Sequence, residues 1–216
     1  MAVAPIKNGK ADTSEIVIAY AGTNFSDRLD LYTDFQSVGL GNKESLYELK
    51  QVSKKTIPIP IPVANSQIIT AEKFAEDIQI DYPNAEVTTT GHSLGEYLAL
   101  YVSAEKGWAN VGFNGPDPYD VLSPEAKKWV KENSHMLFNY RNKADILGNF
   151  GGNGTGAGIP VDMDMAEMIS REELKNINMI DLLSKTDVND LKGIIDSHRL
   201  SAWEFDETGN VAINSS

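Results

Sequence analysis

The clearest hydrophobic pattern in the chain is a run of β-branched and small residues, IVIAYA, at residues 16–21. Gly22 follows it, and a continuous apolar run that ends at a glycine predicts a buried strand. The segment AVAPIK ahead of it is expected to form an antiparallel edge strand. Further short runs of residues that favour β-structure predict strands at residues 86–90, 110–114 and 135–142.

Apolar residues recur at helical spacing in the segment from Ser66 to Tyr82, and Pro83 lies just beyond it. Residues 94–104 are apolar on almost every side, which predicts a buried helix. Ser123 followed by Pro124 is a strong helix start, an N-cap residue and a proline at the first helical position.

The other segments have weaker patterns. Residues 36–65 are expected to be irregular, since the prolines of IPIPIPV forbid a central strand and favour an extended surface segment. Residues 148–158, GNFGGNGTGAG, predict a flexible loop. Met163 to Lys185 predicts one or two amphipathic helices, and residues 203–213, WEFDETGNVAI, predict a hairpin.

The order of these elements, in which strands alternate with helices, predicts an α/β fold with a mostly parallel sheet and helices on both faces. A chain of 216 residues fits one domain, 1–216, with a full hydrophobic core. No internal repeat and no second domain is evident.

Composition narrows the range of partners and chemistry. Nineteen basic and thirty-one acidic residues give a net charge of -12, which argues against nucleic acid and anionic membranes but not against a neutral or zwitterionic lipid surface. The chain has no cysteine, so thiol catalysis and disulfides are excluded. The N-terminal segment lacks the apolar core of a signal peptide, which leaves two expectations, a cytoplasmic protein or export by a non-classical route.

The motif Gly91-His92-Ser93-Leu94-Gly95 lies between a predicted strand and a predicted helix, as a nucleophile elbow requires. The sharp turn would lift the Ser93 hydroxyl clear of the sheet, and the two glycines would let neighbouring chain pack against it. The plain structural interpretation is a glycine-rich turn without chemistry.

An α/β-hydrolase carries its acid and its histidine after the serine, in that order. Of the three histidines, His92 is inside the elbow and cannot serve its own neighbour as a base. His135 is expected where a strand begins, away from the carboxyl ends of the strands. This leaves His198, late in the chain in IIDSHRLSAW, as the expected base.

The expected acid is Asp145, just past the carboxyl end of the predicted strand at 135–142, where catalytic groups gather in parallel sheets. Its rivals are Asp117, Asp120, Asp162 and Asp164. The expected oxyanion donors are the amide of Leu94, directly after the serine, and that of Thr23, in the loop after IVIAYA.

Together these segments resemble the class 3 lipase family, α/β-hydrolases that include fungal triacylglycerol lipases and bacterial relatives. The residues that carry the resemblance are IVIAYAGTN, TGHSLGEYLAL, FNGPDP, YRNKADILG and SHRLSAW, over residues 15–205. The resemblance implies Ser93 as nucleophile, His198 as base and Asp145 as its orienting carboxylate, with Thr23 and Leu94 as oxyanion donors. It also implies hydrolysis of lipid esters, of triacylglycerol lipase or phospholipase A type, without metal or cofactor.

Two positions depart from the family pattern. Ala21 stands where the family usually has arginine, and Glu96 stands where it usually has glycine. In the first turn of a helix, Glu96 is expected to interact favourably with the helix dipole. The elbow with this glutamate also matches malonyl or acyl transacylases, but their N-terminal motif is missing and no arginine follows the elbow before Arg141.

Between the acid and the histidine, residues 148–185 are rich in methionine and other apolar residues, which predicts a helical cap or lid over an acyl groove. Ordinary core-facing helices are the equal alternative. A non-catalytic α/β-hydrolase that acts as a binding module is a further alternative to an enzyme. The short segment before IVIAYA leads to the expectation that the chain is a fragment of a longer protein.

Overall fold

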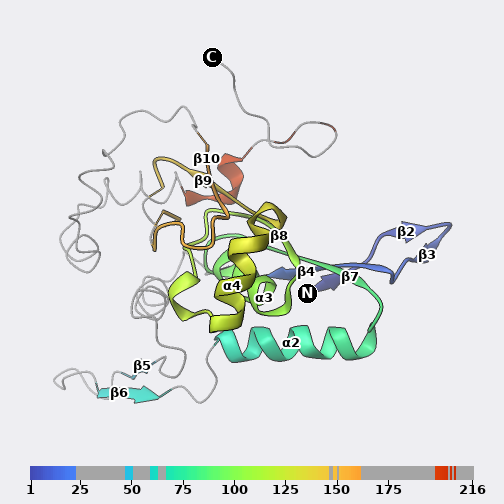
Figure 1. The fold of residues 1–216 in the computed structure, drawn as a ribbon, viewed down its shortest axis with the longest axis horizontal. Coiled ribbons are helices and arrows are strands. Elements are labelled where there is room, and N and C mark those ends of the chain that lie inside the picture. Colours follow the sequence, from blue (N-terminus) through green and yellow to red (C-terminus); the bar gives the residue numbers. More distant parts are fainter. Residues whose placement is uncertain are drawn as a thin grey trace.

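A six-stranded sheet with strand order β1-β4-β7-β8-β9-β10 forms the centre of the protein (Figure 1). The computed structural model describes residues 1–22, 47–50, 59–62, 67–145, 148–149, 151–161, 198–203, 205 and 207. The strands are β1 (Ala2–Val3), β4 (Glu15–Tyr20), β7 (Glu86–Gly91), β8 (Ala109–Phe113), β9 (Leu137–Asn142) and β10 (Gly158–Val161). Only β1 is antiparallel to its neighbour in this sheet, so the predicted α/β class with a mostly parallel sheet is confirmed.

Three α-helices of the described residues pack against the sheet or against one another. They are α2 (Gln67–Asp81), α3 (Leu94–Lys106) and α4 (Pro124–Asn133), with short 3-10 turns at η1 (Tyr119–Val121), η2 (Ser134–Met136) and η3 (Leu200–Ala202). Thr89 of β7 donates from its hydroxyl to the carbonyl of Ala99 in α3 at 3.0 Å. Val87, two residues earlier and therefore on the same face of the strand, packs with Ile78 of α2. α2 and α3 thus lie on one face of the sheet, and the predicted helical cover of the other face is not tested.

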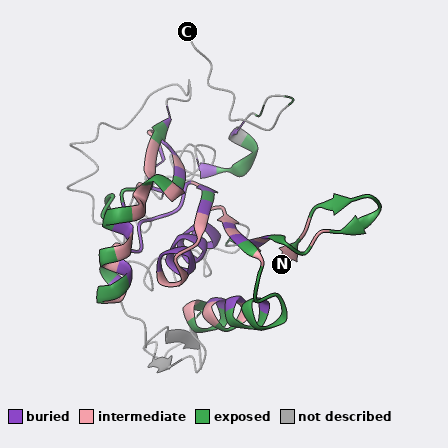
Figure 2. Cartoon of the chain, turned by 45° about the vertical axis from the view of Figure 1, so that its right-hand side comes forward, coloured by how far each residue is buried: buried purple, intermediate pink, exposed green. Residues whose placement is uncertain are grey.

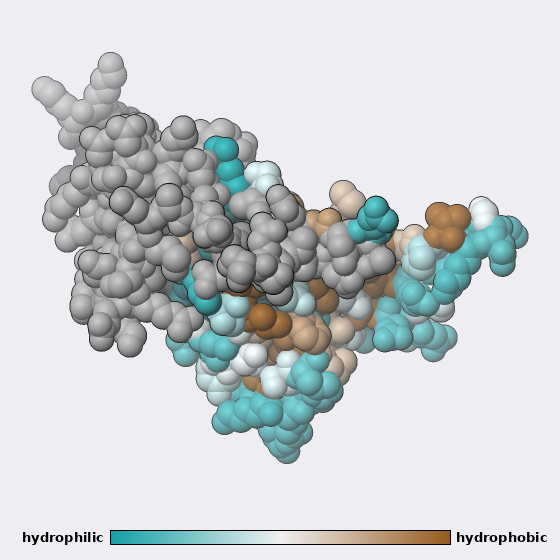
Figure 3. All heavy atoms as spheres, turned by 90° about the horizontal axis from the view of Figure 1, so that it is seen from above, coloured by the Kyte–Doolittle hydropathy of each residue, from teal (hydrophilic) through white to brown (hydrophobic). Residues whose placement is uncertain are grey.

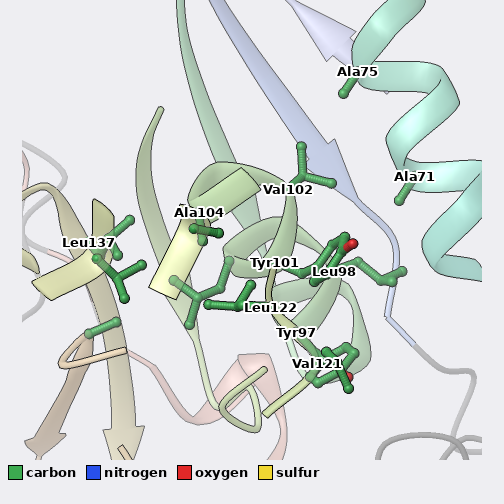
Figure 4. Packing of buried hydrophobic residues seen from close by; sticks show 14 of the residues in the cluster. Ala71, Ala75, Tyr97, Leu98, Tyr101, Val102, Ala104, Val121, Leu122 and Leu137 are labelled. Atoms are coloured by element: carbon green, nitrogen blue, oxygen red, sulfur yellow. The ribbon is translucent and has the colours of Figure 1, made fainter. Parts of the chain in front are cut away.

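The core forms around α3, which is buried on almost every side as its sequence predicts (Figure 2). Ala71 and Ala75 of α2 lie on the side that faces α3, and Leu98 and Val102 of α3 meet them (Figure 4). On the third helix, Ser123 caps the N-terminus by accepting a hydrogen bond from the amide of Ala126. Because α3 packs directly behind the sheet, it holds the turn at its own N-terminus in a fixed place.

Two small sheets lie outside the main one. β2 (Ile6–Lys7) and β3 (Lys10–Ala11) form a hairpin that projects from the molecule and is largely hydrophilic (Figures 1 and 3). β5 (Tyr47–Lys50) pairs with β6 (Ile59–Pro62). The expectation that residues 36–65 are irregular is therefore wrong at these two strands, although the prolines are consistent with their absence from the main sheet.

β10 is a strand that the sequence analysis missed. The predicted loop at residues 148–158 ends where Gly158 pairs with Asn139, and β10 then runs parallel to β9. The turn before β10 is anchored by Thr155, whose hydroxyl donates a hydrogen bond to Asp117 at 2.6 Å. The predicted helices at 163–185 lie outside the described residues, and so does most of the predicted hairpin at 203–213. No helix in the described part of the chain has the length and apolar character needed to cross a membrane.

Candidate active site

Ser93 occupies a strained turn between β7 and α3. Its backbone has φ 60° and ψ -127°, a conformation that costs a non-glycine residue free energy and that the surrounding packing must maintain. The Ser93 amide donates to the carbonyl of Phe113 at 3.0 Å. A Cβ on Gly91 would lie 2.3 Å from the carbonyl carbon of Gly95, and a Cβ on Gly95 would lie 2.4 Å from the carbonyl oxygen of Tyr20. Both glycines are therefore needed for the close approach of neighbouring backbone.

The structure brings the three predicted residues Ser93, His198 and Asp145 together in one hydrogen-bonded chain. His198 Nε2 lies 2.7 Å from Ser93 Oγ, and His198 Nδ1 lies 2.6 Å from Asp145 Oδ2. A carboxylate can only accept, so Nδ1 carries the proton and Nε2 is left to accept the serine hydroxyl. His198 is 1% exposed and Asp145 is 0% exposed, so the pair is shielded from water. This arrangement can withdraw the proton of Ser93.

The rival acids are engaged elsewhere, exposed, or outside the described residues. Asp117 is buried and accepts hydrogen bonds from the hydroxyl of Thr155 at 2.6 Å and from the backbone amide of Tyr119 at 2.8 Å. Asp120 is exposed, while Asp162 and Asp164 are not described. Asp145 is the candidate acid that the structure places in hydrogen-bond contact with His198.

One of the two expected oxyanion donors is placed. Leu94 is the first residue of α3, so its N–H has no acceptor within the helix and lies at the positive end of the helix dipole. Thr23 lies outside the described residues, but Gly22 directly before it is described. A Cβ on Gly22 would lie 2.5 Å from the carbonyl oxygen of His92, so the chain after β4 runs directly against the elbow.

Glu96, in the first turn of α3, is completely buried between the helix and the sheet. Its Oε1 accepts a hydrogen bond from Asn110 Nδ2 at 2.7 Å, while its Oε2 has no hydrogen-bond partner. Burial raises the pKa of Glu96 well above its ordinary value, and the Asn110 hydrogen bond and the charge of Arg141 offset only part of this rise. Burial thus disfavours the charged form of Glu96, and the expected interaction of its carboxylate with the helix dipole stays a prediction.

Two further residues contact His198 that the sequence analysis had not assigned to the site. His92 Nε2 lies 2.6 Å from the carbonyl oxygen of His198, and Asn114 Nδ2 donates to the same oxygen at 3.2 Å. Strand alternation could have indicated the position of His92. It places His92 on the same face as Thr88 and Thr90, opposite the face on which Thr89 contacts the helix. Nothing in the sequence indicated Asn114, which lies 84 residues before His198 and becomes its neighbour only in the folded protein.

An apolar cleft of about 640 Å³ lies beside the elbow. Its lining includes Tyr20, Gly22, His92, Leu200 and Phe205. Since Gly22 and His92 adjoin the turn that carries Ser93, the cleft lies beside that turn. An apolar substituent of a bound molecule would find a complementary surface there.

Comparison with known proteins gives no family. No family model matches the chain, and no curated protein matches it significantly. Within the described residues there is no group of three or more histidine, aspartate or glutamate side chains with the geometry of a metal site. The functional argument therefore rests on the geometry of the site.

Proposed function

We propose that the protein is a serine carboxylic-ester hydrolase that acts on lipid esters through an acyl-enzyme. The observation that carries this proposal is the hydrogen-bonded chain from Asp145 through His198 to Ser93, at a strained strand-to-helix turn. An isolated histidine–carboxylate pair is common in proteins. A serine hydroxyl at 2.7 Å from the second ring nitrogen of such a pair, at the N-terminus of a helix, is the arrangement that acyl transfer needs.

In the proposed reaction His198 Nε2 takes the proton of Ser93 Oγ as that oxygen attacks the ester carbonyl. Asp145 stabilises the imidazolium that forms, and the Leu94 amide donates to the developing oxyanion. His198 then returns the proton to the leaving alcohol. In the second half of the reaction the same histidine activates the water molecule that releases the acid from Ser93. Thr23 is the proposed second oxyanion donor.

The apolar cleft supports a lipid rather than a small polar ester as substrate. Tyr20, Leu200 and Phe205 offer a surface for an acyl chain next to the elbow. The resemblance to class 3 lipases points in the same direction. We therefore propose a triacylglycerol lipase or phospholipase A type of specificity, with a neutral or zwitterionic lipid surface as the natural setting.

Hydrolysis of p-nitrophenyl esters of short, medium and long acyl chains tests the proposal. Wild type is compared with Ser93→Ala and with Ser14→Ala, a matched control at an exposed serine outside the site. We expect Ser93→Ala to lose about 10⁴- to 10⁶-fold in kcat, Ser14→Ala to keep wild-type turnover, and medium or long chains to be preferred. Equal rates for wild type and Ser93→Ala would contradict a serine hydrolase.

The transacylase alternative gains no support from Arg141. It needs an arginine free to pair with the carboxylate of a malonyl group, and Arg141 is the first arginine after the elbow. Arg141 is buried, its Nη1 donates to the carbonyl of Gly152, and its Nη2 lies 3.9 Å from Asp117. It is therefore committed within the fold and not available to a substrate.

A further inference from the structure

The backbone carbonyl of His198 is held from two sides. His92, directly before Ser93, approaches it with Nε2 at 2.6 Å, and Asn114, directly after β8, donates to it from Nδ2 at 3.2 Å. His92 directly follows β7 and Asn114 directly follows β8, so both adjoin strands of the central sheet. The two contacts therefore tie the residue that carries the imidazole to the turn that carries the serine.

His92 acts in this contact as a neutral N–H donor. The carbonyl oxygen of His198 can only accept, so His92 Nε2 must carry a proton. Burial, together with the smaller effect of the nearby His198 imidazole, lowers the pKa of His92 to about 4. The two rings lie 5.0 Å apart between centroids. A neutral His92 therefore leaves His198 free to become cationic during the reaction, which a charge at this distance would oppose.

Asn114 connects the same carbonyl to the strand that leads to Asp145. Its Oδ1 accepts from the amide of Asn142 at 2.9 Å, and the Asp145 amide donates to the carbonyl of Asn142 at 3.0 Å. Asn114 has φ 50°, a left-handed conformation that asparagine and aspartate tolerate better than most residues. One side chain thus sets the position of the histidine relative to the carboxylate.

We propose that His92 and Asn114 are positioning residues, which hold the His198 imidazole between Asp145 and Ser93 through the His198 backbone carbonyl. This inference rests on the proposed function. Nucleophile activation depends on placement of the ring to within a fraction of an ångström, and a displacement of about 1 Å costs on the order of 100-fold in rate. The carbonyl lies only a few bonds from the ring, so anchoring it limits both translation and tilt of the imidazole.

The test compares His92→Gln, which keeps an N–H donor of similar reach, with His92→Leu, which removes it. A third variant, Asn114→Asp, keeps the acceptor for the Asn142 amide but loses the donor to the carbonyl. Each protein is assayed for kcat, KM, the pH profile of kcat/KM, the unfolding temperature and the rate at which a fluorophosphonate labels Ser93. The labelling rate reports activation of the serine without any choice of lipid substrate.

We expect His92→Leu and Asn114→Asp to lower kcat and the labelling rate by about 10- to 100-fold with KM within twofold. We expect His92→Gln to recover most of the loss in kcat and in labelling rate. This variant should also unfold at the same temperature as wild type. For Asn114→Asp, the acid limb of the pH profile should also move to higher pH, because a new carboxylate favours the cationic form of His198.

Three results would overturn the inference. Unchanged kcat and labelling in His92→Leu would show that the contact is not needed. Equal losses in His92→Gln and His92→Leu, together with a lower unfolding temperature in both, would show that His92 acts through packing. Failure of the fluorophosphonate to label wild type would reject the proposed function, whereas normal labelling of both wild type and His92→Leu would reject only this inference.

Discussion

Because the Glu96 carboxyl is buried, we predict how the free energy of unfolding should depend on pH. Its Oε1 accepts from Asn110, while its Oε2 has no partner in a site that is closed to water. The folded protein therefore keeps a proton on Glu96 at a pH where the unfolded chain has lost it. Glutamine has nearly the same shape but no proton to lose, so Glu96→Gln isolates the effect of ionisation.

The direction of the pH dependence follows from the number of protons that the folded and unfolded states bind. An unfolded glutamate ionises near pH 4.3, and the pKa in the folded state is raised. Between these two pKa values the folded state binds one more proton than the unfolded state. The free energy of unfolding of wild type should therefore fall as pH rises, by about 1.4 kcal/mol per pH unit relative to Glu96→Gln. Below both pKa values the difference between the two proteins should be constant.

Urea unfolding at a series of pH values, followed by tryptophan fluorescence, measures this difference. The other carboxyl groups titrate alike in both proteins and cancel. Glu132→Gln, at an exposed position on α4, is the matched control and should run parallel to wild type. A difference between wild type and Glu96→Gln that stays flat from pH 4 upward would refute a neutral Glu96.

Three further predictions concern the site and its support. Asp145→Asn should lower kcat by about 10⁴-fold in the ester assay with little change in KM, and a loss below tenfold would show that Asp145 does not orient His198. Gly112→Ala places a Cβ 1.6 Å from Glu96 Oε2 and should cost at least about 1–3 kcal/mol of stability. This cost should shrink in a Glu96→Ala background, so additive losses in urea unfolding would contradict the contact. Ser123→Ala removes the N-cap of α4 and should cost about 1 kcal/mol, and an unchanged urea midpoint would show that the cap is unimportant.

Local sequence patterns were sufficient for the central strands, for the helices behind them and for the three residues of the candidate site. The elbow motif is local because it needs a strand, a turn and a helix in direct succession. The assignment of Asp145 and His198 followed from their order and from the rule that strand ends in a parallel sheet meet at one edge. The distances of 2.6 and 2.7 Å show how closely the fold satisfies that order.

Three features that the sequence did not reveal depend on contacts between distant segments: strand β10, the burial of Glu96 and the contact of Asn114 with His198. The strand β10 is short and starts within a glycine-rich segment, so only its pairing with β9 gives it an extended form. The burial of Glu96 depends on Gly112, which leaves space on a neighbouring strand. The link from Asn114 to His198 spans 84 residues, and no local pattern encodes it.

The most direct test of the proposed nucleophile is covalent labelling by a fluorophosphonate, with the modified residue identified by mass spectrometry. If Ser93 is activated by His198, wild type should gain one adduct on the peptide that contains Ser93. The adduct should be absent in Ser93→Ala and should form at least about 100-fold more slowly in His198→Ala. No adduct in wild type, or labelling of Ser93 at the same rate without His198, would contradict a serine hydrolase with this triad.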